Sequence, residues 1–220
     1  MWRRWLLVPC LVGAATILGD ASATDRDGYR LMRASLYYVA VEADYPPGRN
    51  AAFQDGAGRV LYRASRDYLA AAAREGAAKT AGGGTLVFDP ENPKAGWRWT
   101  RAPYGVDALG CPLTPYRTAA VPHRIPLGTE LFIPETVGLR LPDGSRHDGR
   151  WYATDRGVGI EGDRIDLFMR LGLASMSGGE AFGLEYLRPL HVGILGRVRG
   201  CPAPTSAGRS SCGAAGAPCS

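Results

Sequence analysis

Four short apolar segments within about 65 residues constrain the fold of this 220-residue chain more than any other feature. They span residues 130–133, 151–154, 165–168 and 191–195, and each has the length of a strand rather than a helix. The 30 Gly and 16 Pro residues make up about a fifth of the chain and predict frequent turns. The sequence therefore favours short strands joined by turns over a bundle of long helices.

Two more strands are predicted upstream, at residues 36–41 and 85–88, because both segments are rich in β-branched and aromatic residues. A helix is predicted within residues 64–78, ending at Gly76 or shortly after it, and a second short helix fits residues 178–187. Six short strands at close intervals predict a mainly β fold, a small closed barrel rather than a βαβ sheet.

The first 23 residues have the pattern of a signal peptide. Arg3 and Arg4 precede an apolar run over residues 6–18, and the small residues 21–23 follow. The run has 13 residues, whereas a membrane-spanning helix needs roughly 20. We expect cleavage after residue 23, a secreted or periplasmic protein, and no transmembrane anchor.

The formal net charge of +5 does not indicate nucleic-acid binding, because the arginines are scattered and form no basic run or helix face. No metal site is predicted, since the cysteine spacings lack the close pairs of a structural zinc site and the three histidines have no ligand spacing.

The cysteines that follow the signal peptide are even in number and predict disulfides in an oxidising compartment. They are Cys111, Cys201, Cys212 and Cys219, and three pairings are open. The tail over residues 201–220 has almost no bulky apolar residues, so only a cross-link would hold it to the fold. We expect Cys111 to pair with one of the tail cysteines.

The segment with most chemical content is Ala153–Phe168. Asp155 ends one predicted strand, Asp166 lies inside the next, and the loop between them carries three glycines. If the face of the strand that carries Asp166 lines a cleft, burial would raise its pKa, as a general acid near neutral pH requires. From spacing alone, a structural ion pair of Asp166 with Arg156 or Arg164 is favoured over that role.

This segment, together with Pro115–Val121 and Ile125–Thr129, resembles the three-aspartate (3D) domain family. That family includes the barrel of membrane-bound lytic transglycosylase A and related bacterial cell-wall hydrolases. The specific part of the resemblance is the interval of eleven residues from Asp155 to Asp166, with Gly, Ile and Gly at matching places between them.

The resemblance implies a six-stranded double-psi β-barrel with one or two short helices and a long loop insertion. Residues 24–200 would form the single domain, residues 46–111 the inserted region, and residues 201–220 a cysteine-containing tail.

The resemblance also implies a lytic transglycosylase that binds peptidoglycan glycan strands. Such an enzyme cleaves between N-acetylmuramic acid and N-acetylglucosamine without water and leaves a 1,6-anhydro end. Asp166 matches the catalytic acid and later base, and Asp155 the supporting carboxylate beside it. We expect a monomer without a cofactor, and substrate-binding residues at Thr118, Arg156, Gly157 and Asp163.

One departure from the family pattern leaves two alternatives open. The family's first aspartate is absent, because Pro122 and His123 stand where it normally lies. Beside the lytic transglycosylase, the alternatives are a non-catalytic barrel that binds a cell-wall glycan or another wall component, which this absence favours, and a hydrolase of another polysaccharide on the same barrel. A hydrolase would use Asp155 and Asp166 as acid and base with water.

The size of the chain is a second departure. Lytic transglycosylase A has a large second domain that forms the other wall of its glycan groove, and the 197 residues after residue 23 leave little room for one. Residues 46–111 could supply a smaller wall. Trp97, Trp99 and Tyr104 in that part of the chain either stack on sugars or pack in a core.

Overall fold

A computed structural model describes residues 28–89, 92–172 and 187–202. Its strands are β1 (Tyr29–Val41), β2 (Ala51–Gln54), β3 (Val60–Ala64), β4 (Ala77–Lys79), β5 (Thr85–Phe88), β6 (Trp97–Thr100), β7 (Thr118–Ala120), β8 (Thr129–Phe132), β9 (Arg150–Asp155), β10 (Arg164–Leu171) and β11 (Arg188–Arg197). The α-helix of the described part is α1 (Arg66–Glu75), and short 3-10 helices cover Glu42–Asp44, Pro93–Ala95 and Pro134–Thr136.

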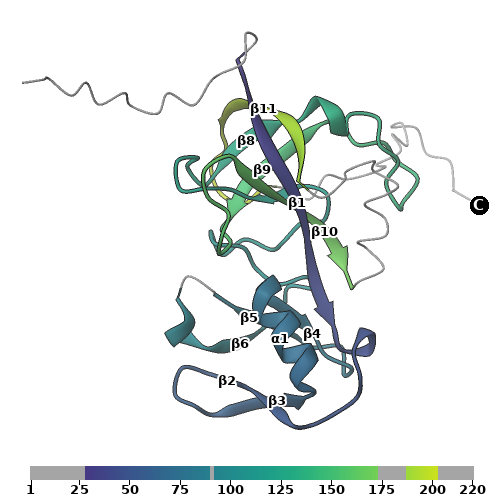
Figure 1. Cartoon of the computed structure of the whole chain (residues 1–220), viewed down its shortest axis with the longest axis vertical. Coiled ribbons are helices and arrows are strands. Elements are labelled where there is room, and N and C mark those ends of the chain that lie inside the picture. Colours follow the sequence, from purple (N-terminus) through teal and green to yellow (C-terminus); the bar gives the residue numbers. More distant parts are fainter. Residues whose placement is uncertain (1–27, 90–91, 173–186, 203–220) are drawn as a thin grey trace, which may run out of the picture.

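Six strands close into a barrel in the order β10-β7-β9-β8-β11-β1, and a parallel pairing of β1 with β10 completes the ring (Figure 1). The barrel core contains fully buried Trp151, Leu131, Ile165 and Leu167. The mainly β fold and the closed six-stranded barrel are therefore confirmed. The double-psi arrangement stays a prediction.

Strand β10 shows how the sequence separates the two faces of the barrel wall. Ile165, Leu167 and Met169 belong to the barrel core, as the alternation of a strand requires. Phe168 belongs to a different cluster, outside the barrel. Asp166 shares the outer face with Phe168, which directs its carboxyl group away from the barrel interior.

Residues 51–100, which we call the second wall, pack against the outside of the barrel (Figure 1). They contain the β2–β3 hairpin, helix α1 and the antiparallel strands β4, β5 and β6. Phe53, Tyr68, Leu86 and Trp97 form much of their core. Most of residues 51–100 are thus folded, and a long irregular segment follows over residues 101–117.

Strand β1 belongs to both parts. Along most of its 13 residues it pairs with β10 and β11 of the barrel, and at its end Ala40 and Val41 pair in parallel with β4. The barrel and the second wall therefore share one continuous sheet. A cluster that includes Tyr37, Val87 and Phe168 fills the space between them.

Helix α1 begins and ends where local chemistry requires. The Ser65 hydroxyl accepts the Tyr68 N–H at 3.3 Å, which satisfies one of the free donors of the first turn. Gly76 follows the last turn with a φ of 75°, a left-handed conformation that glycine adopts without strain. The predicted end of this helix at Gly76 is confirmed.

Several predicted features differ from the structure or fall outside it. Residues 85–88 form a strand, but this strand (β5) lies in the second wall, and β7 takes the sixth place in the barrel. The predicted helix over 178–187 falls almost wholly on residues 173–186, which lie outside the described residues, as do the signal peptide and most of the tail. Within the described ranges, no helix has the length and apolar character to span a bilayer.

Candidate active site

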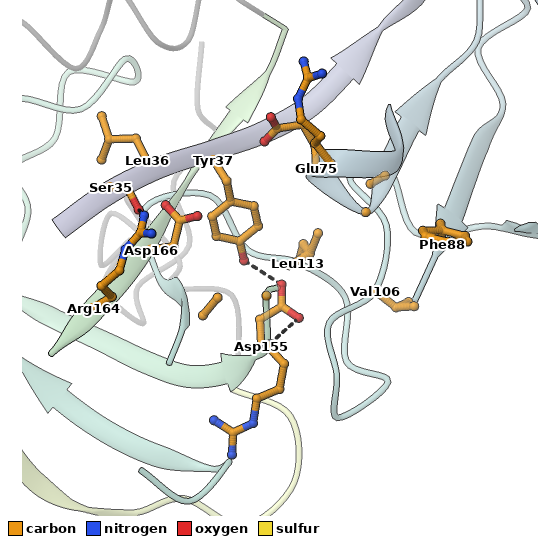
Figure 2. A pocket seen from close by; sticks show the side chains of 16 residues that line it. Ser35, Leu36, Tyr37, Glu75, Phe88, Val106, Leu113, Asp155, Arg164 and Asp166 are labelled. Atoms are coloured by element: carbon orange, nitrogen blue, oxygen red, sulfur yellow. Dashed lines mark hydrogen bonds between the residues drawn. The ribbon is translucent and has the colours of Figure 1, made fainter. Parts of the chain in front are cut away.

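A cavity of about 210 Å³ lies between the outer face of the barrel and the second wall (Figure 2). We call it the carboxyl cavity, because Glu75, Asp155 and Asp166 all line it. A neighbouring cavity of about 250 Å³ shares Asp155 and Arg156 with it and continues past Asp155 toward β6. Asp155 lies in the wall that the two cavities share.

Asp166 reaches the cavity from the outer face of β10. Its register partner in β1 is Ser35, which is buried and lines the same cavity. Burial raises the pKa of Asp166 to about 6, against the opposing effects of the Ser35 hydroxyl and the Arg164 charge. Its Oδ1 atom is buried and has no hydrogen-bond partner within the described residues. A buried acceptor without a partner is uncommon, and a catalytic role is one explanation for it.

Asp155 stands at the end of β9 and is fully hydrogen-bonded. Its Oδ2 accepts the Tyr37 hydroxyl at 2.8 Å, and its Oδ1 accepts the N–H groups of Ala108 at 3.1 Å and Arg156 at 2.9 Å. Burial raises its pKa to about 7, although these donors act in the opposite direction. Two carboxyl groups of one cavity thus titrate close to neutral pH, as acid–base chemistry requires.

The two arginines near these aspartates have distinct contacts. The Arg156 guanidinium donates to the carbonyl groups of Val121, Pro122 and Ile125 at 2.7–3.0 Å, so it supports the segment where the family's first aspartate is missing. Arg164 lies closer to Asp166, and its Nη2 donates to Ser35 Oγ at 3.4 Å. Arg164 lowers the pKa of Asp166 by its charge, but burial outweighs it.

The structure places the remaining predicted residues in different surroundings. Arg156 and Gly157 line the carboxyl cavity. Thr118 is buried in the barrel, away from the cavity, where its hydroxyl accepts the Thr114 N–H at 3.0 Å. Asp163 is exposed and forms an ion pair with Arg124 at 2.7 Å. Only part of the predicted substrate-binding set therefore faces the cavity.

The three aromatic candidates for sugar stacking lie away from the carboxyl cavity. Trp97 packs against Phe53 in the core of the second wall. Trp99 is 47% exposed and its ring edge contacts Tyr62. Tyr104 contacts Phe168 and lines another cavity, on the barrel side. The packing interpretation holds for Trp97.

Three residues that line the cavity were not predicted as site residues from the sequence: Ser35, Tyr37 and Glu75. Tyr37 lies in a segment predicted as a strand and Glu75 in one predicted as a helix, but neither forms a motif with the aspartates. Tyr37 and Asp155 are 118 residues apart in sequence. The successive pairings of β1 with β10, β10 with β7 and β7 with β9 bring them together.

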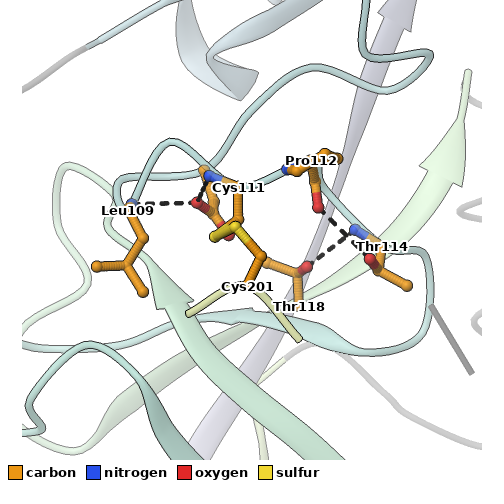
Figure 3. The surroundings of a disulfide bond; sticks show 7 residues. Leu109, Cys111, Pro112, Thr114, Thr118 and Cys201 are labelled. Atoms are coloured by element: carbon orange, nitrogen blue, oxygen red, sulfur yellow. Dashed lines mark hydrogen bonds between the residues drawn. A yellow bond between two sulfur atoms is a disulfide. The ribbon is translucent and has the colours of Figure 1, made fainter. Parts of the chain in front are cut away.

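A disulfide joins Cys111 to Cys201, which confirms the expectation that Cys111 pairs with a tail cysteine (Figure 3). Cys212 and Cys219 lie outside the described residues. Next to the disulfide, the Asp107 carboxylate accepts the backbone N–H groups of Leu109 and Cys111. The turn fixed in this way also carries Ala108, whose N–H donates to Asp155.

A comparison with protein-family models identifies the part of the chain that carries the two aspartates. Residues 117–181 match the family model of the 3D domain. This part of the chain is therefore similar to the 3D domain. Both Asp155 and Asp166 lie within the matched residues, whereas Ser35, Tyr37 and Glu75 come from outside the 3D domain.

Two solved structures resemble the chain beyond the 3D domain. A membrane-bound lytic murein transglycosylase from Agrobacterium tumefaciens has 16% identity and a TM-score of 0.51 over 75% of this chain and 74% of its own. E. coli MltA with bound chitohexaose has 12% identity and a TM-score of 0.50 over 76% and 72%. At these identities the likeness shows the fold alone. No curated protein matches the chain.

Replacing Tyr37 by Phe tests the contact between β1 and the 3D domain. The change removes the hydroxyl that donates to Asp155, so the pKa of Asp155 should rise further above its ordinary value. We expect a loss of stability of about 1 kcal/mol, the usual net contribution of one hydrogen bond. Carboxyl ¹³C NMR titration measures the pKa.

Tyr104→Phe is the matched control for this variant, because the Tyr37 and Tyr104 rings both contact Phe168. It should leave the Asp155 titration unchanged. An unchanged titration in Tyr37→Phe itself would show that the hydroxyl does not control the protonation of Asp155.

Proposed function

We propose that this protein is a secreted or periplasmic lytic transglycosylase that cleaves the glycan strands of peptidoglycan. The observation that carries the proposal is the buried, unpartnered Oδ1 of Asp166 in a cavity next to Asp155. The resemblance to the 3D domain family assigns the catalytic acid to this same position. The Ser35 hydroxyl acts on this carboxyl group, and Oδ1 is the atom left to meet a bound ligand.

One carboxyl group is sufficient for both halves of the reaction. Protonated Asp166 donates its proton to the glycosidic oxygen as the bond to C1 of N-acetylmuramic acid breaks. The C6 hydroxyl oxygen then bonds to C1, and the Asp166 carboxylate takes its proton. The products are a 1,6-anhydro end and a free hydroxyl on N-acetylglucosamine, and Asp166 is protonated again. Water is not consumed, in contrast to glycosidases that use two carboxyl groups.

Asp155 is the supporting group in this proposal. Its hydrogen bonds to Tyr37, Ala108 and Arg156 fix the carboxylate in the cavity wall. In its ionised form it would stabilise the positive charge that develops at C1. Arg156 and Gly157, which also line the cavity, are the substrate-binding candidates that the geometry supports.

Hydrolysis with water is the second candidate. The observation that favours it is the presence of two carboxyl groups in one cavity, because an inverting or retaining glycosidase uses one protonated and one ionised carboxyl group. Asp166 would then act as the acid, and Asp155 would activate a water molecule or attack C1. This candidate requires that Asp155 exchange its three hydrogen bonds for contacts with water or sugar.

Digestion of peptidoglycan sacculi in H₂¹⁸O separates the candidates. The lytic reaction predicts muropeptides with anhydro ends and no ¹⁸O, detected by mass spectrometry of the products. Reducing ends that carry ¹⁸O would select hydrolysis and overturn the lytic proposal. Binding to sacculi with no soluble product at any pH would instead identify a non-catalytic glycan-binding barrel.

A further inference from the structure

Glu75 is the third carboxyl group of the carboxyl cavity, and it comes from the second wall. It is the last residue of α1, whose end faces β1 and the barrel (Figure 2). Its Oε2 accepts the backbone N–H of Tyr38 at 3.3 Å. The side chain is partly exposed and lines the cavity.

The position of Glu75 is unfavourable for a charged carboxylate. Burial raises its pKa to about 7, and the nearby charge of Asp166 acts in the same direction. The C-terminus of a helix carries a partial negative charge, which also disfavours an anion. The backbone N–H of Tyr38 and the Arg74 charge oppose these effects but are weaker than burial. Glu75 is therefore protonated for much of the time at neutral pH.

A structural role does not require an acid at this position. A glutamine would accept the Tyr38 N–H equally well, without the desolvation that burial of a carboxylate entails. A protonated carboxyl group has one additional property: it donates one hydrogen bond and accepts another. Residues that break local rules of stability in this way concentrate at functional sites.

We propose that Glu75 binds the glycan from the wall opposite the 3D domain, with its protonated carboxyl group hydrogen-bonded to a hydroxyl or acetamido oxygen of the sugar beside Asp166. That the ligand is a glycan rests on the proposed function. Two observations support it independently of that function: Glu75 of the second wall and Asp166 of the barrel line the same cavity, and Oδ1 of Asp166 is unpartnered within the described part of the chain. A sugar between them would contact both walls at once.

The test compares Glu75→Ala and Glu75→Gln with the unchanged protein, using an N-acetylglucosamine hexasaccharide as the probe. Calorimetry should show that Glu75→Ala weakens binding by about tenfold, the effect of losing one hydrogen bond to a buried group. Glu75→Gln keeps a donor and an acceptor, so its affinity should stay close to that of the unchanged protein. Asp67→Asn, on the exposed first turn of the same helix, is the matched control and should have no effect.

Kinetics on solubilised glycan strands provide the second readout. A positioning contact predicts a higher KM for Glu75→Ala, with a smaller change in kcat. Unchanged hexasaccharide affinity and KM in Glu75→Ala, with only a lower melting temperature, would overturn the inference and leave Glu75 as a support for β1.

A different result would contradict the proposed function. Sacculi would then give no anhydro ends, while weaker binding of the hexasaccharide to Glu75→Ala would still support the contact. Absence of hexasaccharide binding to the unchanged protein would overturn the Glu75 inference, even if anhydro products are formed from sacculi.

Discussion

Replacing Asp166 by Asn should lower the turnover of peptidoglycan by about 10²–10⁴-fold, the usual contribution of a general acid. Asparagine has the shape of aspartic acid but cannot deliver a proton to the glycosidic oxygen. Glycan binding should remain nearly unchanged, because the amide still occupies the cavity wall. The measurements are anhydro-muropeptide release and binding of the protein to sacculi.

The same variant should be more stable than the unchanged protein above about pH 6. The pKa of Asp166 is raised in the folded state, to about 6, above its value in an unfolded chain. Ionisation therefore destabilises the folded protein as the pH rises from about 4 to above 6. The amide in Asp166→Asn does not ionise, so the stability difference should be absent at low pH and should increase through this window.

Activity of the unchanged protein should fall as the pH rises above about 6, because the acid loses its proton.

Asp163→Asn is the control for Asp166→Asn, because it removes an exposed carboxylate of the same segment that pairs with Arg124. It should leave turnover within about twofold of the unchanged protein, since exposed ion pairs contribute little. Full activity in Asp166→Asn would remove Asp166 from the role of acid.

Loss of the Cys111–Cys201 disulfide should lower the free energy of unfolding by about 3–5 kcal/mol. The cross-link spans 90 residues, so it removes much conformational freedom from the unfolded chain. The expected measurement is a lower urea midpoint for the double variant Cys111→Ser/Cys201→Ser. The unchanged protein with a reducing agent should give the same midpoint, and an unaltered midpoint in both would contradict the stabilising role.

The disulfide should also affect the carboxyl cavity. It holds the turn at residues 107–111, whose Ala108 N–H donates to Asp155. If this turn moves away, Asp155 loses one of its three hydrogen bonds and its pKa should rise further. NMR titration of the folded double variant measures this shift. A titration identical to that of the unchanged protein would show that the turn keeps its place without the cross-link.

The sequence predicted most of the barrel because its strands carry strong local signals. Residues 130–133, 151–154, 165–168 and 191–195 are apolar and bounded by turns, and each lies within or next to a strand. Strand β7 was missed because Thr118–Ala120 has three residues and no run of β-branched side chains. The second wall was underestimated for the same reason, since β4 consists of Ala77–Lys79 and is a strand only through its partners.

The two aspartates were predictable from two local signals: the alternation of side chains along the strand that carries Asp166, and the interval of eleven residues between Asp155 and Asp166. Spacing alone favoured an ion pair for Asp166, whereas the structure buries its Oδ1 without a partner in the described part of the chain. Tyr37 and Glu75 were not predictable, because their place in the cavity depends on pairings between segments far apart in sequence. Local patterns carry no information on such contacts.

The shared strand β1 has a consequence for how the chain reaches its native state. Its barrel partners β10 and β11 are made more than a hundred residues after it, so closure of the ring must wait until residues 164–197 have been synthesised. The second wall has its own core and is complete by residue 100, so it can form first. Long-range pairings of this kind slow folding. Until they form, β1 presents unpaired backbone groups that would favour aggregation.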